Sequence, residues 1–430
     1  MTGPTELARR FGTPAYVYDL DRVAAARDDL FAALPDEVAV FYAAKANPHP
    51  EILRELRTGA AHGTDGSHST RDTRGTHGTR ACRAEISSAG ELDAVLRAGY
   101  DGSEVLYTGP GKTTGELAEA MTRGVRMFSV ESLGDLRRVG ETAVRLGVTA
   151  DCLIRVNNAT GAAATSIRMT GVSSQFGFDS ETLPGLAAEL REVPGTTLAG
   201  LHFFPLSNAK DEASLVAEFR HTIATAAALR DALGVPFRFV DIGGGFAAPY
   251  AVQGHRSAYG GLRDALTASL DEHFPGWRDG APRIACESGR YLVADSGTLL
   301  TTVVNVKDSR GTRYAVLDAG INTFGGMSGL GRILPVSVEP HESVGTDGTP
   351  AHLAGPLCTP GDLLGRAVPL PDPAPGDLLT VPNAGSYGPT ASLLMFLGRP
   401  APAEIVVRGD DLVSVSRIQH IRTYEHGQAL

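Results

Sequence analysis

The feature of this sequence that most constrains its fold is a repeated pairing of a short apolar segment with an amphipathic segment. Runs such as VAVFYAA, which begins at residue 38, have the character of buried parallel strands, and the segments 90–99 and 132–147 have the period of surface helices. The predicted strands end near Ala44, Ser87, Tyr107, Ser129, Val156, Phe204, Ile242 and Cys286. Eight strand–helix units in succession predict an α/β fold, a (β/α)8 TIM barrel, although a doubly wound open sheet would give the same alternation.

Polar residues and a glycine turn mark the ends of these predicted strands. At or just beyond the carboxyl ends lie Lys45, Glu85, Arg155, His202, Gly243–Gly245 and Glu287. A (β/α)8 barrel carries its active site on that face. The placement therefore favours the barrel and predicts a site there.

Lys45 ends the first of these strands, in the stretch VAVFYAAKANPHPEIL. A lysine at such a position often only extends its amine to solvent. The alternative is a Schiff-base lysine that holds an aldehyde cofactor. This stretch alone leaves both interpretations open.

After about Val293 the pattern changes to short strands separated by Gly, Pro and Asp turns, which predicts a β-sandwich-like or β-barrel-like domain. The strand candidates are TTVVNV, RYAVLDAG, ILPVSVEP, LLTVPNAG and EIVVRGDDLVSVSRI. The early strand candidate AYVYDL, at 15–20, is expected to pair with this second domain. We therefore assign 1–30 to an amino-terminal strand segment of the β domain, 31–293 to the barrel and 294–430 to the β domain itself.

One segment fits neither domain. Residues 58–83 are rich in Gly, Thr, Arg and His and have no apolar period. The histidines His62, His68 and His77 raise the question of a metal site, but their irregular spacing favours a disordered insertion beside the active-site face. We expect no metal in this protein.

Composition bounds the partners and the location. The 430 residues carry a net charge of −10, which argues against nucleic acid as the main partner. The chain has neither an apolar run long enough to span a bilayer nor the apolar core of a signal peptide, so we expect no membrane association. The cysteines, Cys82, Cys152, Cys286 and Cys358, are scattered without metal or disulfide spacing, which is typical of the cytoplasm.

Two motifs of the barrel suggest a phosphorylated ring as ligand. VDIGGGF, at 240–246, ends a strand in three glycines, whose backbone N–H groups can approach a phosphate closely, although tight turns also use glycine. In ESGR, Glu287 can pair with a protonated pyridine nitrogen and Arg290 can support a phosphate. A structural ion pair between Glu287 and Arg290 would explain the second motif equally well.

Two further motifs lie in the predicted β domain. GPLCTPGD places Cys358 in a Pro- and Gly-rich turn, and NAGSYG places Tyr387 in another. A single cysteine is more often inert than catalytic, so this observation alone leaves the role of Cys358 open.

Together the motifs resemble those of the fold-type III pyridoxal-phosphate decarboxylases, the group of diaminopimelate, ornithine and arginine decarboxylases. The matching stretches are YAAKAN, EISSAGEL, SQFGF, GLHFF, DIGGGF, ESGRYLVA, GPLCTPGD, NAGSYG and FLGRPAPAEIVV. They run in the family's order over nearly the whole chain. The resemblance implies a barrel followed by a β domain, working as a homodimer with active sites shared between subunits.

The resemblance also implies roles for single residues. Lys45 would form the Schiff base with pyridoxal 5′-phosphate, Glu287 would keep the pyridine nitrogen protonated, and Cys358 would enter from the other subunit to protonate the α-carbon. The residues implied around the cofactor are Glu85, Arg155, His202, Phe204, Ser207, Gly243, Gly244, Gly245, Gly289, Arg290 and Tyr387, and those implied near the substrate are Thr359, Asp362 and Tyr387.

Three departures from the family pattern bear on the substrate. Phe204 stands where family members carry a histidine stacked on the cofactor, Thr359 replaces the acidic residue after the cysteine, and DAGINTFGGMSG lacks the usual Arg-Pro pair. We therefore predict a specialised-metabolism enzyme that decarboxylates a modified or carrier-protein-linked α-amino acid, as in the carrier-linked glutamyl decarboxylases of antibiotic pathways. The alternatives are a diaminopimelate decarboxylase of lysine biosynthesis, a pyridoxal-phosphate-dependent racemase and a non-catalytic binding protein.

Overall fold

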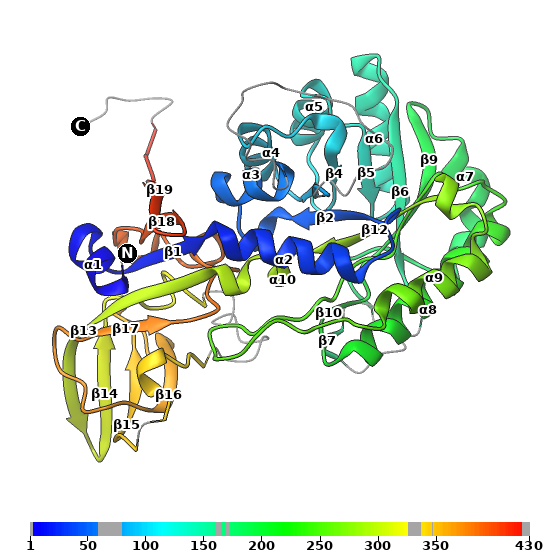
Figure 1. Ribbon diagram of the computed structural model, residues 1–430. Helices are drawn as coiled ribbons and strands as arrows, with labels where there is room; N and C mark the ends of the chain where they lie inside the picture. The colour runs from blue at the N-terminus through cyan, green and yellow to red at the C-terminus, as the bar shows by residue number, and fades with distance from the viewer. Residues whose placement is uncertain are drawn as a thin grey trace. The chain divides into compact units, whose positions relative to one another are not determined.

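Figure 1 shows the computed structural model, which describes residues 3–58, 80–159, 165–168, 173–325, 337–345 and 347–423. Most of the predicted insertion at 58–83 lies outside these residues, including His62, His68 and His77. The chain divides into a barrel unit (Val23–Ala248 and Arg256–Leu292) and a β unit (Met1–Arg22, Pro249–His255 and Val293–Leu430). Within the described residues, we find no helix with the length and hydrophobicity that a membrane span requires.

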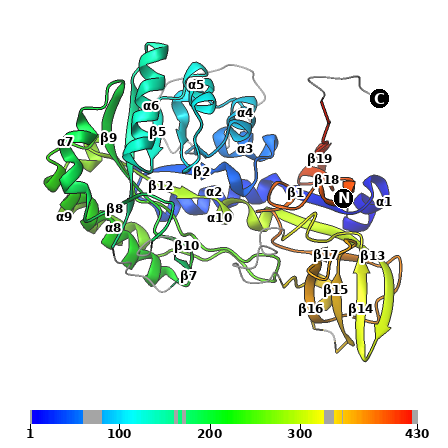
Figure 2. The same ribbon diagram turned by 180° about the vertical axis from the view of Figure 1, so that it is seen from behind.

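The barrel unit is built around a closed sheet of eight parallel strands, seen from two sides in Figures 1 and 2. The strands are β2 (Ala39–Ala43), β3 (Arg83–Ile86), β4 (Val105–Tyr107), β5 (Met127–Val130), β6 (Ala150–Asn157), β9 (Thr196–Phe203), β11 (Phe239–Asp241) and β12 (Arg283–Ser288). The pairing of β5 with β6 closes the sheet. This confirms the predicted barrel and excludes the open doubly wound sheet.

Helices follow most of these strands on the outside of the barrel (Figure 2). They are α3 (Pro50–Thr58), α4 (Ala89–Arg97), α5 (Thr114–Thr122), α6 (Leu133–Leu146), α7 (Ala187–Arg191), α8 (Glu212–Leu233), α9 (Leu262–His273) and α10 (Arg290–Val293). A further helix, α2 (Leu20–Ala33), precedes the first barrel strand, β2. The shorter elements are η1 (Ala44–Ala46), η2 (Gly102–Glu104), η3 (Leu183–Leu186), η4 (Trp277–Asp279), β7 (Thr165–Arg168), β8 (Phe178–Asp179) and β10 (Leu206–Ala209). The limits of α6 follow from its sequence, because the Ser132 hydroxyl accepts the Asp135 N–H and Gly147 ends the helix with a φ of 66°.

The barrel interior is a packed core. Phe41, Leu106, Leu153 and Phe239 come from alternate strands of the barrel and belong to one buried cluster. Side chains from alternate strands form such layers in this fold. The interior is therefore filled, and ligand binding is left to the ends of the strands.

The β unit is a mainly antiparallel sheet, which confirms the predicted second domain. Its strands are β1 (Ala15–Asp19), β13 (Gly297–Ser309), β14 (Thr312–Leu317), β15 (Pro350–Ala354), β16 (Leu363–Pro369), β17 (Leu378–Val381), β18 (Ala403–Arg408) and β19 (Asp411–Arg417). Its remaining elements are α1 (Pro4–Phe11), η5 (Ala294–Ser296), η7 (His341–Ser343), η8 (Pro389–Ala391) and η9 (Phe396–Gly398). The predicted strand AYVYDL forms β1, which lies between β13 and β18.

One predicted strand is wrong over its described part. Residues 337–340 of ILPVSVEP form no strand, although the N–H of Val338 donates to the Leu364 carbonyl. Pro340 has no N–H to donate, so a regular ladder cannot continue through it. The strands β15 and β16, which the sequence pattern did not indicate, provide the antiparallel pairing of this region.

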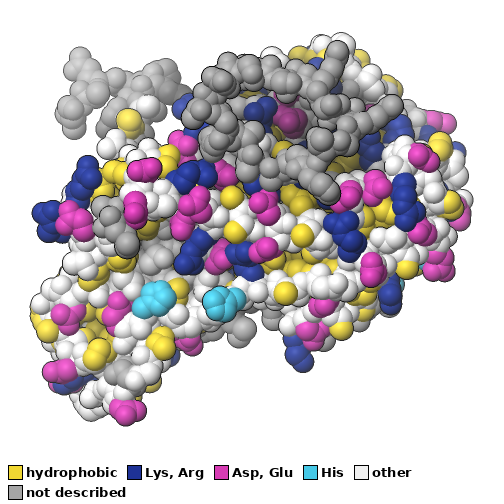
Figure 3. All heavy atoms as spheres, in the orientation of Figure 1, with side chains coloured by type: hydrophobic (Ala, Val, Ile, Leu, Met, Phe, Trp, Pro, Cys, Tyr) yellow, Lys and Arg dark blue, Asp and Glu magenta, His cyan; other side chains and the backbone are white. Residues whose placement is uncertain are grey.

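Acidic and basic side chains are interspersed on the face drawn in Figure 3. Such side chains also form ion pairs between distant segments of the barrel unit, for example Arg263 with Asp36 at 3.1 Å and Arg256 with Asp29. Because Asp36 and Asp29 are largely exposed, such pairs contribute little to stability. The buried charges are therefore the better candidates for a functional role.

Candidate active site

Lys45 lies in η1, the turn that follows β2. Its side chain is 40% exposed, while both neighbouring alanines are buried. The Nζ atom lies 3.0 Å from Oε2 of Glu85, which is itself 2% exposed. The amine is thus accessible and at the same time held by a buried carboxylate.

Lys45 differs from the other lysines of the chain in its position. The sequence holds four lysines, and the other three are Lys112, Lys210 and Lys307. Lys112 is buried in an ion pair, Lys210 is exposed at the start of the segment that leads into α8, and Lys307 lies on the β unit. Lys45 is the accessible lysine that directly follows a barrel strand at its carboxyl end.

Glu85 accepts hydrogen bonds from several donors. Its two oxygens lie 3.3 and 3.0 Å from Lys45 Nζ, and the Thr108 hydroxyl donates to Oε1. Ser87 Oγ lies 2.9 Å from Thr108 Oγ1 and extends this network. A buried carboxylate with donors on both oxygens provides a fixed negative charge beside the lysine.

Glu287, in β12, is a second buried anion. Its Oε1 lies 3.0 Å from His202 Nε2, and His202 Nδ1 lies 2.6 Å from the Ser129 hydroxyl. Burial alone would raise the pKa of Glu287, but attraction to His202, Lys45 and Arg155 holds that pKa below its usual value of 4.5. The contact between Glu287 and His202 is close but does not satisfy hydrogen-bond geometry. Glu287 Oε1 therefore retains the capacity to accept a hydrogen bond from a ligand.

Asp241, the last residue of β11, lies beside this pair. One oxygen accepts the Gly243 N–H at 2.9 Å, and the other has no hydrogen-bond partner within the described residues. Burial and the neighbouring Glu287 carboxylate raise the pKa of Asp241 to about 7. Asp241, beside the Glu287 carboxylate, can therefore hold a proton near neutral pH.

These side chains also raise the question of a metal ion. Ligand atoms of His202, Asp241 and Glu287 all lie within 4.8 Å of one another. However, the charges of Lys45 and Arg155 already stabilise Glu287, and they would repel a further cation. The arrangement suits a protonated nitrogen better than a metal.

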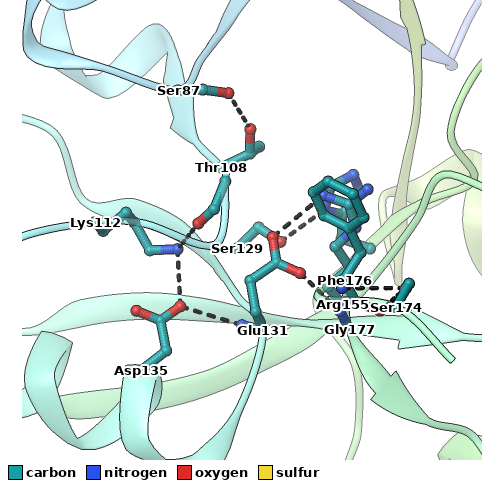
Figure 4. A network of polar contacts seen from close by, with 12 residues as sticks. Ser87, Thr108, Lys112, Ser129, Glu131, Asp135, Arg155, Ser174, Phe176 and Gly177 are labelled. Carbon is teal, nitrogen blue, oxygen red and sulfur yellow. Dashed lines mark hydrogen bonds and ion pairs between the residues drawn. The ribbon is translucent and has the colours of Figure 1, made fainter. Parts of the chain in front are cut away.

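Two cations face the ring of Phe204. Lys45 Nζ lies 5.4 Å and the Arg155 guanidinium 6.0 Å from the centre of that ring, and Arg155 also lies 4.8 Å from the ring of Phe176. Figure 4 shows Arg155 beside Phe176, in contact with Glu131. Phe204 can stack on a flat ligand, but unlike histidine it cannot hydrogen-bond to one.

The glycine turn is closely packed. Gly243 and Gly245 have φ values of 77° and 124°, and a Cβ on Gly244 would come within 2.3 Å of the Glu287 carbonyl. Only glycine fits these conditions. Among the described residues, the N–H groups of Gly244 and Gly245 donate no hydrogen bond, so both are available to an anion.

Three further predicted residues, Ser207, Gly289 and Arg290, belong to the barrel unit. Ser207 lies in β10, which the Ala209 N–H joins to the Gly245 carbonyl at 2.8 Å. Arg290 begins α10 and is partly exposed. A Cβ on Gly289 would come within 3.1 Å of Ala46, so this glycine allows the ESGR turn to approach the Lys45 turn.

The remaining predicted residues belong to the β unit. Cys358 is exposed and unpaired, in the turn between β15 and β16, and Thr359 follows it. Asp362 is 3% exposed, and its oxygens accept the N–H groups of Ile321 and Leu357, each at 2.7 Å. Asp362 therefore fixes the turn that carries Cys358, while contact with a substrate stays a prediction. Tyr387 is half-buried with a φ of 51°.

Sequence reasoning missed four residues of the site: Thr108, Ser129, Glu131 and Asp241. All four lie at the carboxyl ends of barrel strands or just beyond them, and this position was the available signal. What they contact depends on neighbouring strands, which a single segment does not reveal.

Comparison with known proteins agrees with this geometry. Residues 77–294 match the family model described as "Pyridoxal-dependent decarboxylase, pyridoxal binding domain". The chain is 32% identical to the diaminopimelate decarboxylase of Deinococcus radiodurans, over 94% of this chain and 93% of that protein. It is 28% identical to the L-glutamyl-(BtrI acyl-carrier protein) decarboxylase of Niallia circulans, over 96% of this chain and 93% of that protein. The crystal structure of lysine decarboxylase from Selenomonas ruminantium is similar in fold, with a TM-score of 0.75, 26% identity and 95% of each chain covered.

The residues of the barrel unit fit pyridoxal 5′-phosphate. An accessible amine at Lys45 suits its aldehyde, the free N–H groups of Gly244 and Gly245 suit its phosphate, and the anionic Glu287 suits its pyridine nitrogen. Phe204 offers a flat apolar surface to the ring. On this agreement of site, fold and relatives, the chain belongs to the fold-type III pyridoxal-phosphate-dependent amino-acid decarboxylases.

Proposed function

We propose that this enzyme removes the α-carboxyl group of a modified or carrier-linked amino acid, with Lys45 as the covalent anchor of the cofactor. The observation that carries the anchor assignment is the placement of Lys45: accessible, directly after a barrel strand, and paired with a buried glutamate. The bound cofactor supplies an electron sink for the bond that breaks. The residues of the chain bind it, orient the substrate and manage the protons.

In the reaction, the bond between the α-carbon and its carboxylate breaks and carbon dioxide leaves. The electron pair stays on the α-carbon side, and one proton is then added to that carbon. Glu287 contributes a fixed negative charge that favours a protonated ring nitrogen, and its low pKa keeps it ionised at neutral pH. Phe204 contributes a ring surface without a competing proton donor.

Cys358 is the proposed donor of that proton. Its thiol is exposed, in a turn that Asp362 fixes through two backbone N–H groups. The other three cysteines are buried, so Cys358 is the accessible thiol of the chain. Lys45 belongs to the barrel unit and Cys358 to the β unit. We propose that a homodimer combines Lys45 of one subunit with Cys358 of the other.

The proposed substrate follows from the absence of charged side chains at the described positions directly after the DAG motif and directly after Cys358. In the described residues after the DAG motif, Asn322 and Thr323 are buried and uncharged, and Thr359 follows Cys358. A free ammonium or carboxylate at the far end of a substrate would lose its hydration without gaining a partner. The relative from Niallia circulans, whose name includes a glutamyl acyl-carrier protein, supports a far end that is attached to a carrier.

Free diaminopimelate is the second candidate, because the relative from Deinococcus radiodurans has the higher identity. Carbon dioxide release from free diaminopimelate, ornithine, lysine and glutamate, and from glutamyl thioesters of pantetheine and of an acyl-carrier protein, separates the two. Our proposal predicts faster release from the thioesters. Efficient turnover of free diaminopimelate would contradict it, and inversion of a substrate without carbon dioxide would indicate a racemase.

A further inference from the structure

Glu131 is a buried carboxylate that the reaction does not use directly. It directly follows β5 and is 7% exposed. One oxygen lies 3.2 Å from Arg155, and the other accepts the Gly177 N–H at 2.8 Å. Glu131 thus joins the end of one barrel strand to the cation on the next strand and to the turn that carries Phe176.

A second buried pair fixes Glu131 in turn. The Glu131 N–H donates to Asp135 at 3.1 Å, and Asp135 lies 2.8 Å from Lys112 Nζ, with side-chain exposures of 4% and 1%. Lys112 also donates to the Gly109 carbonyl at 2.5 Å. Figure 4 shows this series of contacts, which runs from Lys112 through Asp135 and Glu131 to Arg155. Buried ion pairs and hydrogen bonds of this kind restrict the side chains to one geometry, although Asp135 Oδ1 has no hydrogen-bond partner among the described residues.

Arg155 lies near two carboxylates, those of Glu131 and Glu287. It contributes to the low pKa of Glu287, so its charge acts on that group. Its ion pair, however, is with Glu131, while the close partner of Glu287 is His202. An arginine paired directly with Glu287 would compete with a protonated ring nitrogen for the oxygens of that carboxylate.

We infer that Glu131 is a positioning residue that holds Arg155 beside the cofactor ring and away from Glu287. The inference rests on the proposed role of Glu287 as partner of the ring nitrogen. It assigns the Lys112–Asp135 pair a supporting role, because that pair fixes the backbone of Glu131. Phe176 and Phe204 cannot replace Glu131, because their rings attract Arg155 without fixing its direction as a carboxylate does.

The test uses the affinity of the full-length apoprotein for pyridoxal 5′-phosphate, measured by visible absorbance. In Glu131→Gln the side chain loses its negative charge and presents an N–H₂ group to one of the two donors, so Arg155 is held less firmly. We expect the dissociation constant to rise about tenfold or more. In an Arg155→Gln background, the same substitution should change the dissociation constant less than about twofold, because Glu131 acts through Arg155.

Glu55→Gln is the matched control. Glu55 is a buried glutamate of the same unit, paired with Arg27 at 3.5 Å. We expect this variant to lower the midpoint of thermal unfolding and to leave cofactor affinity within about twofold. If Glu131→Gln does not fold, Glu131→Asp, which keeps the charge but shortens its reach, replaces it in the same cycle.

Two results would overturn the inference: cofactor affinity of Glu131→Gln close to that of the wild type, or a loss that persists in full without Arg155. A Glu287→Gln arm separates this outcome from failure of the proposed function. Unchanged spectra and affinity in Glu287→Gln would reject the role of Glu287. The coupling between Glu131 and Arg155 is decided by the double-mutant cycle alone.

Discussion

Glu404 is a buried carboxyl of the β unit, and it offers a quantitative test of the structure. It lies in β18, is 7% exposed, and accepts a hydrogen bond from the Tyr18 hydroxyl at 3.2 Å. Burial raises its pKa from the usual 4.5 to about 7, against the opposing effect of the Tyr18 hydrogen bond. Because the folded pKa lies above the unfolded one, the unfolded state releases its proton first as the pH rises. Stability is therefore lost between about pH 4.5 and 7.

The expected magnitude follows from linkage. A carboxyl with these two pKa values costs about 1 kcal/mol of unfolding free energy at pH 5 and about 3 kcal/mol at pH 8. Glu404→Gln keeps an oxygen for Tyr18 and removes the titrating group. We expect the variant to be more stable than the wild type at pH 8 by up to about 3 kcal/mol, with a much smaller gain at pH 5.

Urea unfolding of the cofactor-saturated protein, followed by circular dichroism at both pH values, measures this difference. Glu141→Gln, a change at an exposed glutamate of α6, is the control and should shift neither value. Equal stability of Glu404→Gln and the wild type at pH 8, or a larger gain at pH 5 than at pH 8, would refute the argument.

Three further predictions concern the site. Glu287→Gln should raise the activation barrier by several kcal/mol and so lower turnover on the order of 10²-fold or more, with a smaller effect on cofactor occupancy. Near-normal turnover would contradict the role of Glu287. Asp362→Asn should change the rate at which iodoacetamide alkylates Cys358, because the turn loses a charged acceptor of two N–H groups. In the control Asp377→Asn, which changes a carboxylate that accepts the Ala374 N–H, the rate should stay the same; equal rates in the two variants would reject the positioning role of Asp362. Mixing inactive Lys45→Ala and Cys358→Ala proteins should restore activity at up to about a quarter of the sites if each site is shared between subunits, and exchange without recovery would favour a site within one subunit.

The sequence predicted the barrel well because each buried strand is a distinct apolar run. Predicted ends such as Ala44, Ser87 and Ile242 lie within two residues of the ends of β2, β3 and β11. The residues at the carboxyl ends could be assigned to the site for the same reason, since parallel strands of a barrel present those ends on one face.

Contacts between strands could not be predicted in this way. Ser129 of β5 contacts His202 of β9, although β6 lies between these strands. Glu131, which follows β5, pairs with Arg155 of β6, because the closed sheet brings these side chains together. The sequence SVES at 129–132 contains no local pattern that predicts either contact. The short segment Pro249–His255, which belongs to the β unit although barrel sequence flanks it, is a similar case.

The central claim is that Lys45 holds the cofactor, and one measurement tests it directly. The protein is saturated with pyridoxal 5′-phosphate, reduced with borohydride and digested, and the peptides are analysed by mass spectrometry. The sequence offers four lysines, so the possible results are few. Our account predicts the reduced cofactor on the peptide that contains Lys45, and no such label in Lys45→Ala. Label on Lys112, Lys210 or Lys307 instead, or label retained in Lys45→Ala, would contradict it.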